Sequence, residues 1–267
     1  MPELRRVASV TSIAIAWVAL TACDVVVGGI QNADKLGGRA TDTWTRSFPL
    51  DAAGVVQVTN TNGKVTVEAY DGDTVEVKVE KLARAFTDEA AKALLGQITV
   101  IQSASPKLVK FETKQPRHFG VGHAEVKYTL RVPRKAKVDL DTTNGGIEVA
   151  GTFAGIEADT VNGGVVAKDL SGPLKASAVN GGLTIALASV SADVHLETTN
   201  GGIRLTLPGN AKANISARVS NGGISVSNID LDDISERSRR KLDARMNGGG
   251  PKIDLETTNG GIRIGAK

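Results

Sequence analysis

The tripeptide Asn-Gly-Gly recurs along the second half of the chain and constrains the fold more than any other feature. Successive copies are 18, 18, 20, 21 and 38 residues apart, and they begin at Asn144, Asn162, Asn180, Asn200, Asn221 and Asn259. A related Asn-Gly-Lys stands upstream at Asn62, and a degenerate copy at Asn247 falls inside the longest interval. Self-similarity at such a short period is typical of repeat architectures in which each unit contacts only its neighbours.

Apolar residues occupy the same positions around each of these asparagines. The third and fifth residues after the asparagine are apolar in every Asn-Gly-Gly copy, as Ile147 and Val149 are in the first. The fourth and sixth residues before it are apolar too, as Leu140 and Val138 are. The residues between them are mostly polar. This period of two predicts a strand on each side of the turn, with one face of each strand buried.

Two architectures satisfy this pattern, an antiparallel meander of hairpins and a parallel β-solenoid of stacked coils. The repeated apolar columns favour the solenoid, because like positions of successive coils then lie about 4.8 Å apart along one axis. We therefore predict an all-β fold, a parallel β-solenoid of short coils turning at Asn-Gly-Gly.

The turn asparagines would form a ladder of stacked amides in this solenoid. Asn180 would lie in the middle of the ladder and Asn259, the last in sequence, nearer its end. We expect glycine to follow each asparagine because the corner needs a positive φ.

The N-terminal sequence predicts where in the cell the protein is located. Arg5 and Arg6 precede an uncharged run over residues 7–20, and "LTAC" then ends at Cys23, the single cysteine of the chain. This pattern resembles a bacterial lipoprotein signal, with a signal peptide over residues 1–22 and lipidation at Cys23. It predicts a protein of the cell envelope, extracytoplasmic and lipid-anchored to a membrane.

The rest of the chain divides by composition. Residues 23–46 are rich in small and polar types and predict a flexible tether. Residues 47–137 predict a β-rich region with a short helix at Thr87–Leu95, capped by Thr87. Residues 138–267 predict the solenoid, with a charged helical insertion over residues 229–246.

Composition and motifs argue against nucleic-acid binding, catalysis, and cofactor or metal binding. The net charge of +3 is too small to predict a nucleic-acid partner, and aromatic residues make up only 3% of the chain. The sequence holds no nucleophile elbow and no phosphate-binding loop, and its histidines lack further ligands at metal-binding spacing. We expect no catalytic residues, no cofactor and no metal.

One acidic cluster is a candidate site. Asp139 and Glu157, like Asp141 and Asp159, are separated by the 18-residue period, so coil stacking would bring all four carboxylates into one outward patch. Such a patch either binds a divalent cation or cationic ligand, or is a solvated face softened by water and salt.

Most of the chain resembles the bacterial putative-adhesin family, a domain-of-unknown-function family of predicted β-solenoids in envelope proteins. The resemblance covers residues 47–267 and is carried by "VKYTLRVPRKAKVDLDTTNGGIEV" and "GGGPKIDLETTNGGIRI". Its most specific parts are Tyr128–Pro133 and Gly248–Pro251; where members commonly carry Asp after the turn glycine, this chain carries a second Gly. The resemblance implies a non-enzymatic extracytoplasmic scaffold, and carries over no catalytic residue.

Three functions remain open from the sequence. The first is a binding or adhesion module for an unknown surface glycan or envelope protein, held at the membrane by its N-terminal lipid. The second is a structural or envelope-stress component that works through protein partners. The third is a polysaccharide-acting β-helix enzyme, which the scarcity of aromatic residues disfavours.

Overall fold

The computed structural model describes residues 36–116 and 122–266, which fold into two large sheets and one short helix. The first sheet, in spatial order, contains β1 (Gly38–Pro49), β4 (Thr74–Ala85), β7 (His123–Pro133), β3 (Val65–Tyr70), β9 (Ile147–Ala150), β11 (Val165–Leu170), β13 (Leu183–Leu187), β15 (Ile203–Leu207), β21 (Ile262–Ala266) and β17 (Ile224–Ser227). The second contains β18 (Asp233–Arg237), β19 (Lys241–Met246), β16 (Ala213–Asn221), β20 (Lys252–Asn259), β14 (Val194–Asn200), β12 (Leu174–Asn180), β10 (Gly155–Asn162), β8 (Lys137–Asn144), β2 (Val55–Asn62), β6 (Leu108–Lys114) and β5 (Thr99–Ser105).

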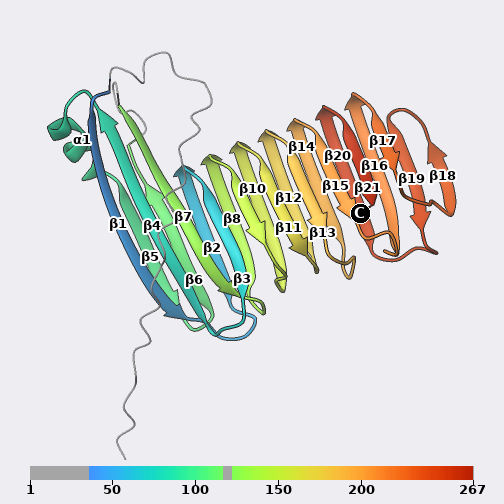
Figure 1. Ribbon diagram of the computed structural model, residues 1–267, viewed down its shortest axis with the longest axis horizontal. Coiled ribbons are helices and arrows are strands. Elements are labelled where there is room, and N and C mark those ends of the chain that lie inside the picture. The colour runs from blue at the N-terminus through green and yellow to red at the C-terminus, as the bar shows by residue number, and fades with distance from the viewer. Residues whose placement is uncertain (1–35, 117–121, 267) are drawn as a thin grey trace, which may run out of the picture. The chain divides into compact units, whose positions relative to one another are not determined.

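Each Asn-Gly corner joins a strand of the second sheet to a strand of the first. Successive coils then pair in parallel and in register, so that Asn162 lies beside Asn144 on one side and beside Asn180 on the other. Figure 1 shows these paired strands side by side, from β2 and β3 to β16 and β17. The prediction of an all-β parallel solenoid is therefore confirmed.

The apolar columns of the sequence form the core between the sheets. Leu140, Leu196 and Leu255 come from one column and are fully buried, as are Ile147 and Leu183 from another. The buried cluster is continuous from Leu50 to Ile264, and β2 and β3 form a coil that stacks on β8 and β9. The core therefore runs unbroken across the boundary that composition suggests at residue 138.

The coils do not stack in the order of the sequence. The C-terminal coil, β20 and β21, lies between the coil of β14 and β15 and the coil of β16 and β17. Asn259 is therefore flanked by Asn200 and Asn221, and Asn221 ends the column. Asn259 is therefore the last-but-one rung of the ladder, nearer its end than Asn180 as expected, but it has an asparagine neighbour on each side.

The helix predicted at Thr87–Leu95 is present as α1 (Asp88–Leu95). The Thr87 hydroxyl accepts a hydrogen bond from the Ala90 N–H at 3.2 Å and thereby caps the first turn. Ala91 and Leu94 are buried, with Ala91 packed against Ala40 of β1 and Ala85 of β4. Within the described ranges, no helix has the length and apolar character needed to cross a bilayer.

The helix predicted within residues 229–246 is instead the hairpin of β18 and β19. Leu242, Ala244 and Met246 alternate with exposed or half-buried residues, a period of two that the abundant charges of this segment mask. The open edge of β16 needs hydrogen-bond partners, and β19 pairs with it in antiparallel orientation.

The tether predicted over residues 23–46 ends earlier than expected. β1 begins at Gly38 and pairs with β4 along its whole length. Its alternation is obscured because mainly Gly38 and Ala40 face the buried side, and both are small.

The turn glycines have a different role from the one expected. Of the glycines that directly follow the stacked asparagines, only Gly63 and Gly222 have positive φ. At Gly145, Gly163, Gly181, Gly201 and Gly260, a Cβ would instead lie 1.6–2.1 Å from a carbonyl oxygen of the adjacent coil. Glycine is required at these five positions because stacked backbones approach too closely for any side chain.

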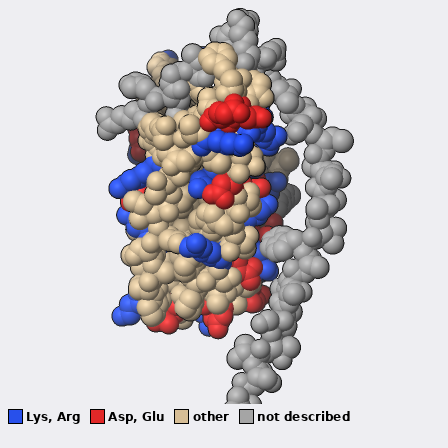
Figure 2. All heavy atoms as spheres, turned by 90° about the vertical axis from the view of Figure 1, so that its left-hand side faces the viewer, with Lys and Arg blue, Asp and Glu red and all other residues tan. Residues whose placement is uncertain are grey.

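Cross-strand ion pairs cover the outer faces of the sheets. The pairs Lys81–Asp42, Arg131–Glu76 and Lys64–Glu148 have N–O distances of 2.6–2.9 Å. Figure 2, seen from the β1 side, shows acidic and basic side chains of the described residues interspersed on that face. Opposite charges on neighbouring strands stabilise the pairing modestly, and like charges destabilise it. An outward row of residues with the same charge therefore needs another explanation.

Candidate binding groove

An open groove of about 640 Å³ crosses several coils of the second sheet, near the ends of the strands opposite the asparagines. Its floor includes Ala154, Gly155 and Pro173, which project little or nothing outward. A Cβ on Gly155 would meet only the Lys137 side chain, at 3.9 Å. The groove exists because the row that begins at Lys137 has short residues, Gly155 and Pro173, on the next two strands, before charged side chains return at Asp193 and Lys252.

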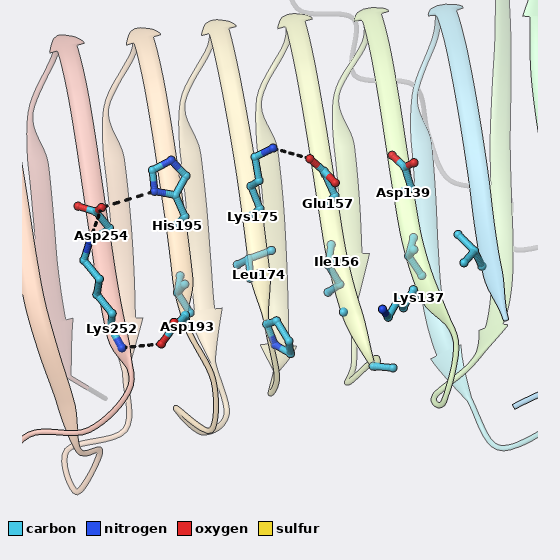
Figure 3. Close-up of a pocket in the computed structure, with 16 residues that line it drawn as sticks. Lys137, Asp139, Ile156, Glu157, Leu174, Lys175, Asp193, His195, Lys252 and Asp254 are labelled. Carbon is cyan, nitrogen blue, oxygen red and sulfur yellow. Dashed lines mark hydrogen bonds and ion pairs between the residues drawn. The ribbon is translucent and has the colours of Figure 1, made fainter. Parts of the chain in front are cut away.

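Charged side chains of both signs form the rim of the groove. One row runs through Asp139, Glu157, Lys175, His195 and Asp254, which occupy the same position in successive stacked coils (Figure 3). Lys175 donates a hydrogen bond to Glu157 at 2.5 Å, and His195 Nδ1 lies 3.8 Å from Asp254 Oδ2.

Lys252 connects the two rows at one end of the groove. Its Nζ lies 2.9 Å from Asp254 Oδ2, and its backbone N–H donates to Asp193 at 2.8 Å. Lys137 lies at the other end (Figure 3). The rim therefore presents charges of both signs, at intervals of one strand spacing, to a molecule lying across the coils.

The four carboxylates of the predicted acidic patch occupy neighbouring strands, as the repeat implies. Asp139 pairs in register with Glu157, and Asp141 pairs with Asp159. Asp139 and Glu157 also line the groove, whereas the other two lie beyond its rim. Three of the four have neutralising or hydrogen-bonding neighbours, since Gln57 donates to Asp139, Lys175 to Glu157 and Ser177 to Asp159.

Asp141 is the carboxylate of the patch on which the repulsion between like charges acts most clearly. Burial raises the pKa of the Asp141 carboxyl above its usual range, and the charges of Asp159 and Asp139 raise it further. Among the described residues, no group of three or more His, Cys, Asp or Glu is placed to hold a metal ion. The patch is therefore a row of four carboxylates on neighbouring strands, three of which have lateral partners within the sheet.

The asparagines form a continuous ladder along the corner of the coils. Each amide donates to the side-chain oxygen of the next asparagine at 2.7–2.9 Å, through the chain Asn221, Asn259, Asn200, Asn180, Asn162, Asn144 and Asn62. Threonines just inside the corner add a second column of bonds, since Thr160, Thr198 and Thr257 donate to glycine carbonyls of neighbouring coils. The ladder ties the coils together away from the groove.

Ladder position predicts the cost of losing each amide. Asn259 bonds to an asparagine on both sides, whereas Asn221 bonds only to Asn259. We expect Asn259→Ala to lower the free energy of unfolding by about 1–2 kcal/mol, close to the effect of Asn180→Ala, and Asn221→Ala to cost about half as much. Urea denaturation of the three variants measures these values. An Asn259→Ala cost no larger than that of Asn221→Ala would contradict the inserted position of the last coil.

The sequence-based candidates cover only part of the groove. Lys175, His195, Asp254 and Lys252 are rim residues that no motif singles out. They share the repeat positions of Asp139 and Lys137, so following the two columns through every copy would have found them. Cys23 and its signal peptide lie outside the described residues.

Comparison with known proteins places these features in a family. The family model Toastrack DUF4097 matches residues 56–265, which span the groove and the ladder. A comparison with curated proteins gave no match.

Several solved structures are similar at low identity. One is a putative cell adhesion protein from Clostridium sporogenes, with 12% identity, a TM-score of 0.49, and coverage of 85% of this chain and 100% of that one. Another is a putative adhesin from Bacteroides fragilis, with 14% identity, a TM-score of 0.39, and coverage of 85% and 97%. A third, a putative lipid binding protein from Parabacteroides distasonis, has 12% identity, a TM-score of 0.29, and coverage of 85% and 97%.

Proposed function

Since the chain belongs to the Toastrack DUF4097 family, we propose that it is a non-enzymatic binding scaffold of the cell envelope, anchored through lipid on Cys23. The observation that carries the binding role is the groove across the second sheet. Its floor is formed by residues with short, partly apolar side chains. Its rim offers hydrogen-bond donors and acceptors at a regular spacing. An extended surface glycan or an extended segment of an envelope protein fits such a site, because both repeat their polar groups along their length.

The ion pairs that the groove carboxylates form with lysines favour a binding role over catalysis. General acid–base work on a glycan needs a carboxyl group free to exchange a proton with the substrate. Glu157 is tied to Lys175, and Asp254 to Lys252. The enzyme alternative therefore ranks below a binding role, and a screen for glycan degradation tests it directly.

The proposed anchor rests on the N-terminal sequence. A positive start, an uncharged run and "LTAC" precede the folded region, whose first strand is β1. Acyl chains on Cys23 would hold the solenoid at a membrane, since each buried CH₂ contributes about 0.8 kcal/mol.

Photo-crosslinking from the groove tests the binding role. A photoreactive amino acid at Gly155, where a side chain meets only Lys137, should capture a partner in intact cells. The control position is Thr45 of β1, which is exposed on the other sheet. We expect the product to be specific to Gly155 and to disappear when Asp139 and Lys175 are both changed to alanine.

The chemistry of the product separates the two partners. Sensitivity to periodate indicates a glycan, and sensitivity to protease indicates an envelope protein and favours the structural or stress-related role. Equal products from Gly155 and Thr45, or products unaffected by the double substitution, would refute the groove as the binding site.

A further inference from the structure

Two arginines lie side by side on the outer face of the first sheet, in the part of the stack nearest β17. Arg204 of β15 and Arg263 of β21 pair in register, and both are exposed. Neighbouring parallel strands are about 4.8 Å apart, so the two guanidinium groups share one small area. Among the described residues, neither side chain has an ion pair or hydrogen bond.

The surroundings of this pair hold hydroxyl groups instead of carboxylates. Thr184 lies beside Arg204, and Ser225 lies beside Arg263. Continuing along this row away from β17, the first carboxylate is Glu148 on β9, three strands or about 14 Å from Arg204. That carboxylate already pairs with Lys64 at 2.6 Å.

A third arginine approaches from the hairpin beyond the last coil. The Arg239 side chain lies beside Gly223, where its Cγ and Nε would be 3.7 Å from an added Cβ. The Gly223 carbonyl accepts the N–H of Ile262, the residue before Arg263. The C-terminal end of the first sheet therefore gathers positive charge from three segments of the chain.

This arrangement differs from the other in-register arginine pair, Arg39 and Arg84. Asp88 lies against that pair, because its carboxylate accepts the Arg39 backbone N–H at 3.0 Å. Like charges on neighbouring strands destabilise a sheet unless something neutralises them. Arg204 and Arg263 lack an internal counter-charge among the described residues, so an external anion is the natural partner.

We propose that Arg204 and Arg263, assisted by Arg239, form a binding site for a phosphate group. A single guanidinium fork satisfies the two oxygens of a carboxylate, whereas a phosphate has further oxygens that a second fork engages. The hydroxyl groups of Thr184 and Ser225 flank the pair as additional donors. The site lies on the sheet opposite the groove, so it stands or falls independently of binding in the groove.

Binding to inorganic phosphate tests the site. The full-length chain in neutral detergent is titrated with phosphate by calorimetry, at an ionic strength held constant with chloride. We expect saturable binding by the wild type, weakened at least about tenfold by Arg204→Gln and by Arg263→Gln, and lost in the double variant. Lys168→Gln, on the same outer face, is the matched control and should bind like the wild type.

Competition identifies the source of the phosphate. Micelles containing phosphatidylglycerol compete if the group belongs to a lipid, and glucose 1-phosphate competes if it belongs to a glycan. Thermal melts in chloride verify folding, because the arginine variants lose only a repulsion and should melt no lower than the wild type. Absence of saturable phosphate binding by the wild type, or equal binding by the folded double variant, would overturn the proposal.

Discussion

Gly181→Ala is expected to lower the free energy of unfolding by about 3 kcal/mol or more. A Cβ at this position would lie 1.6 Å from the Gly163 carbonyl oxygen and 2.4 Å from its carbon. Both are backbone atoms of the neighbouring coil, so relief requires the two coils to move apart. Separation would lengthen the hydrogen bonds between strands and loosen the core beneath them. Urea denaturation monitored by circular dichroism measures the loss.

Gly146→Ala is the matched control for this effect. Gly146 is also a turn glycine, but its Cβ would lie 3.6 Å from the nearest atom, the Gly164 carbonyl oxygen. The free energy of unfolding should change by less than about 1 kcal/mol, and the reduced freedom of the unfolded chain favours stabilisation. Equal effects at Gly146 and Gly181 would show that coil contact is not the reason for glycine at the corner.

Cys23→Ala is expected to abolish lipid attachment and to leave the chain as an unprocessed precursor. The thiol is the acceptor of the lipid in the signal that "LTAC" resembles, and the chain has no second cysteine to replace it. Metabolic labelling with a palmitate analogue, followed by gel fluorescence, measures the attachment. Asp24→Asn keeps the thiol and should be labelled like the wild type. Equal labelling of Cys23→Ala and the wild type would disprove the anchor.

The regular part of the fold could be predicted because each coil repeats the same contacts. The columns headed by Val138, Leu140, Ile147 and Val149 recur in every copy, and only in-register stacking buries them together. The same spacing places Asp139 beside Glu157. Register, core and candidate patch therefore follow from the period of the repeat and the period of the strand.

The order of the coils could not be predicted from the same information. Residues 196–203 read LETTNGGI, and residues 255–262 read the same. These two coils present the same residues to a neighbouring coil over this stretch, so the repeat motif alone does not decide which of them lies nearer the end of the stack. In the structure the coil of β16 and β17 is outermost, and the hairpin of β18 and β19, over residues 233–246, covers the free edge of β16. That segment reads as charged and helical because its buried side is limited to a few residues such as Leu242 and Met246.

The position of the coil of β20 and β21 inside the stack also constrains the order in which the chain can fold during synthesis. A ribosome adds coils one at a time, and those through β15 find their permanent neighbour as soon as they emerge. The coil of β16 and β17 does not, since its neighbour in the finished stack is built from residues 252–266. The strands β16 and β17 must therefore remain unpaired until then, or pair temporarily with β14 and β15 and later dissociate from them. The stack is complete only after residues 252–266 have been synthesised. A chain that stops before residue 252 would lack the coil that separates β14 and β15 from β16 and β17, rather than the coil at the end of the stack.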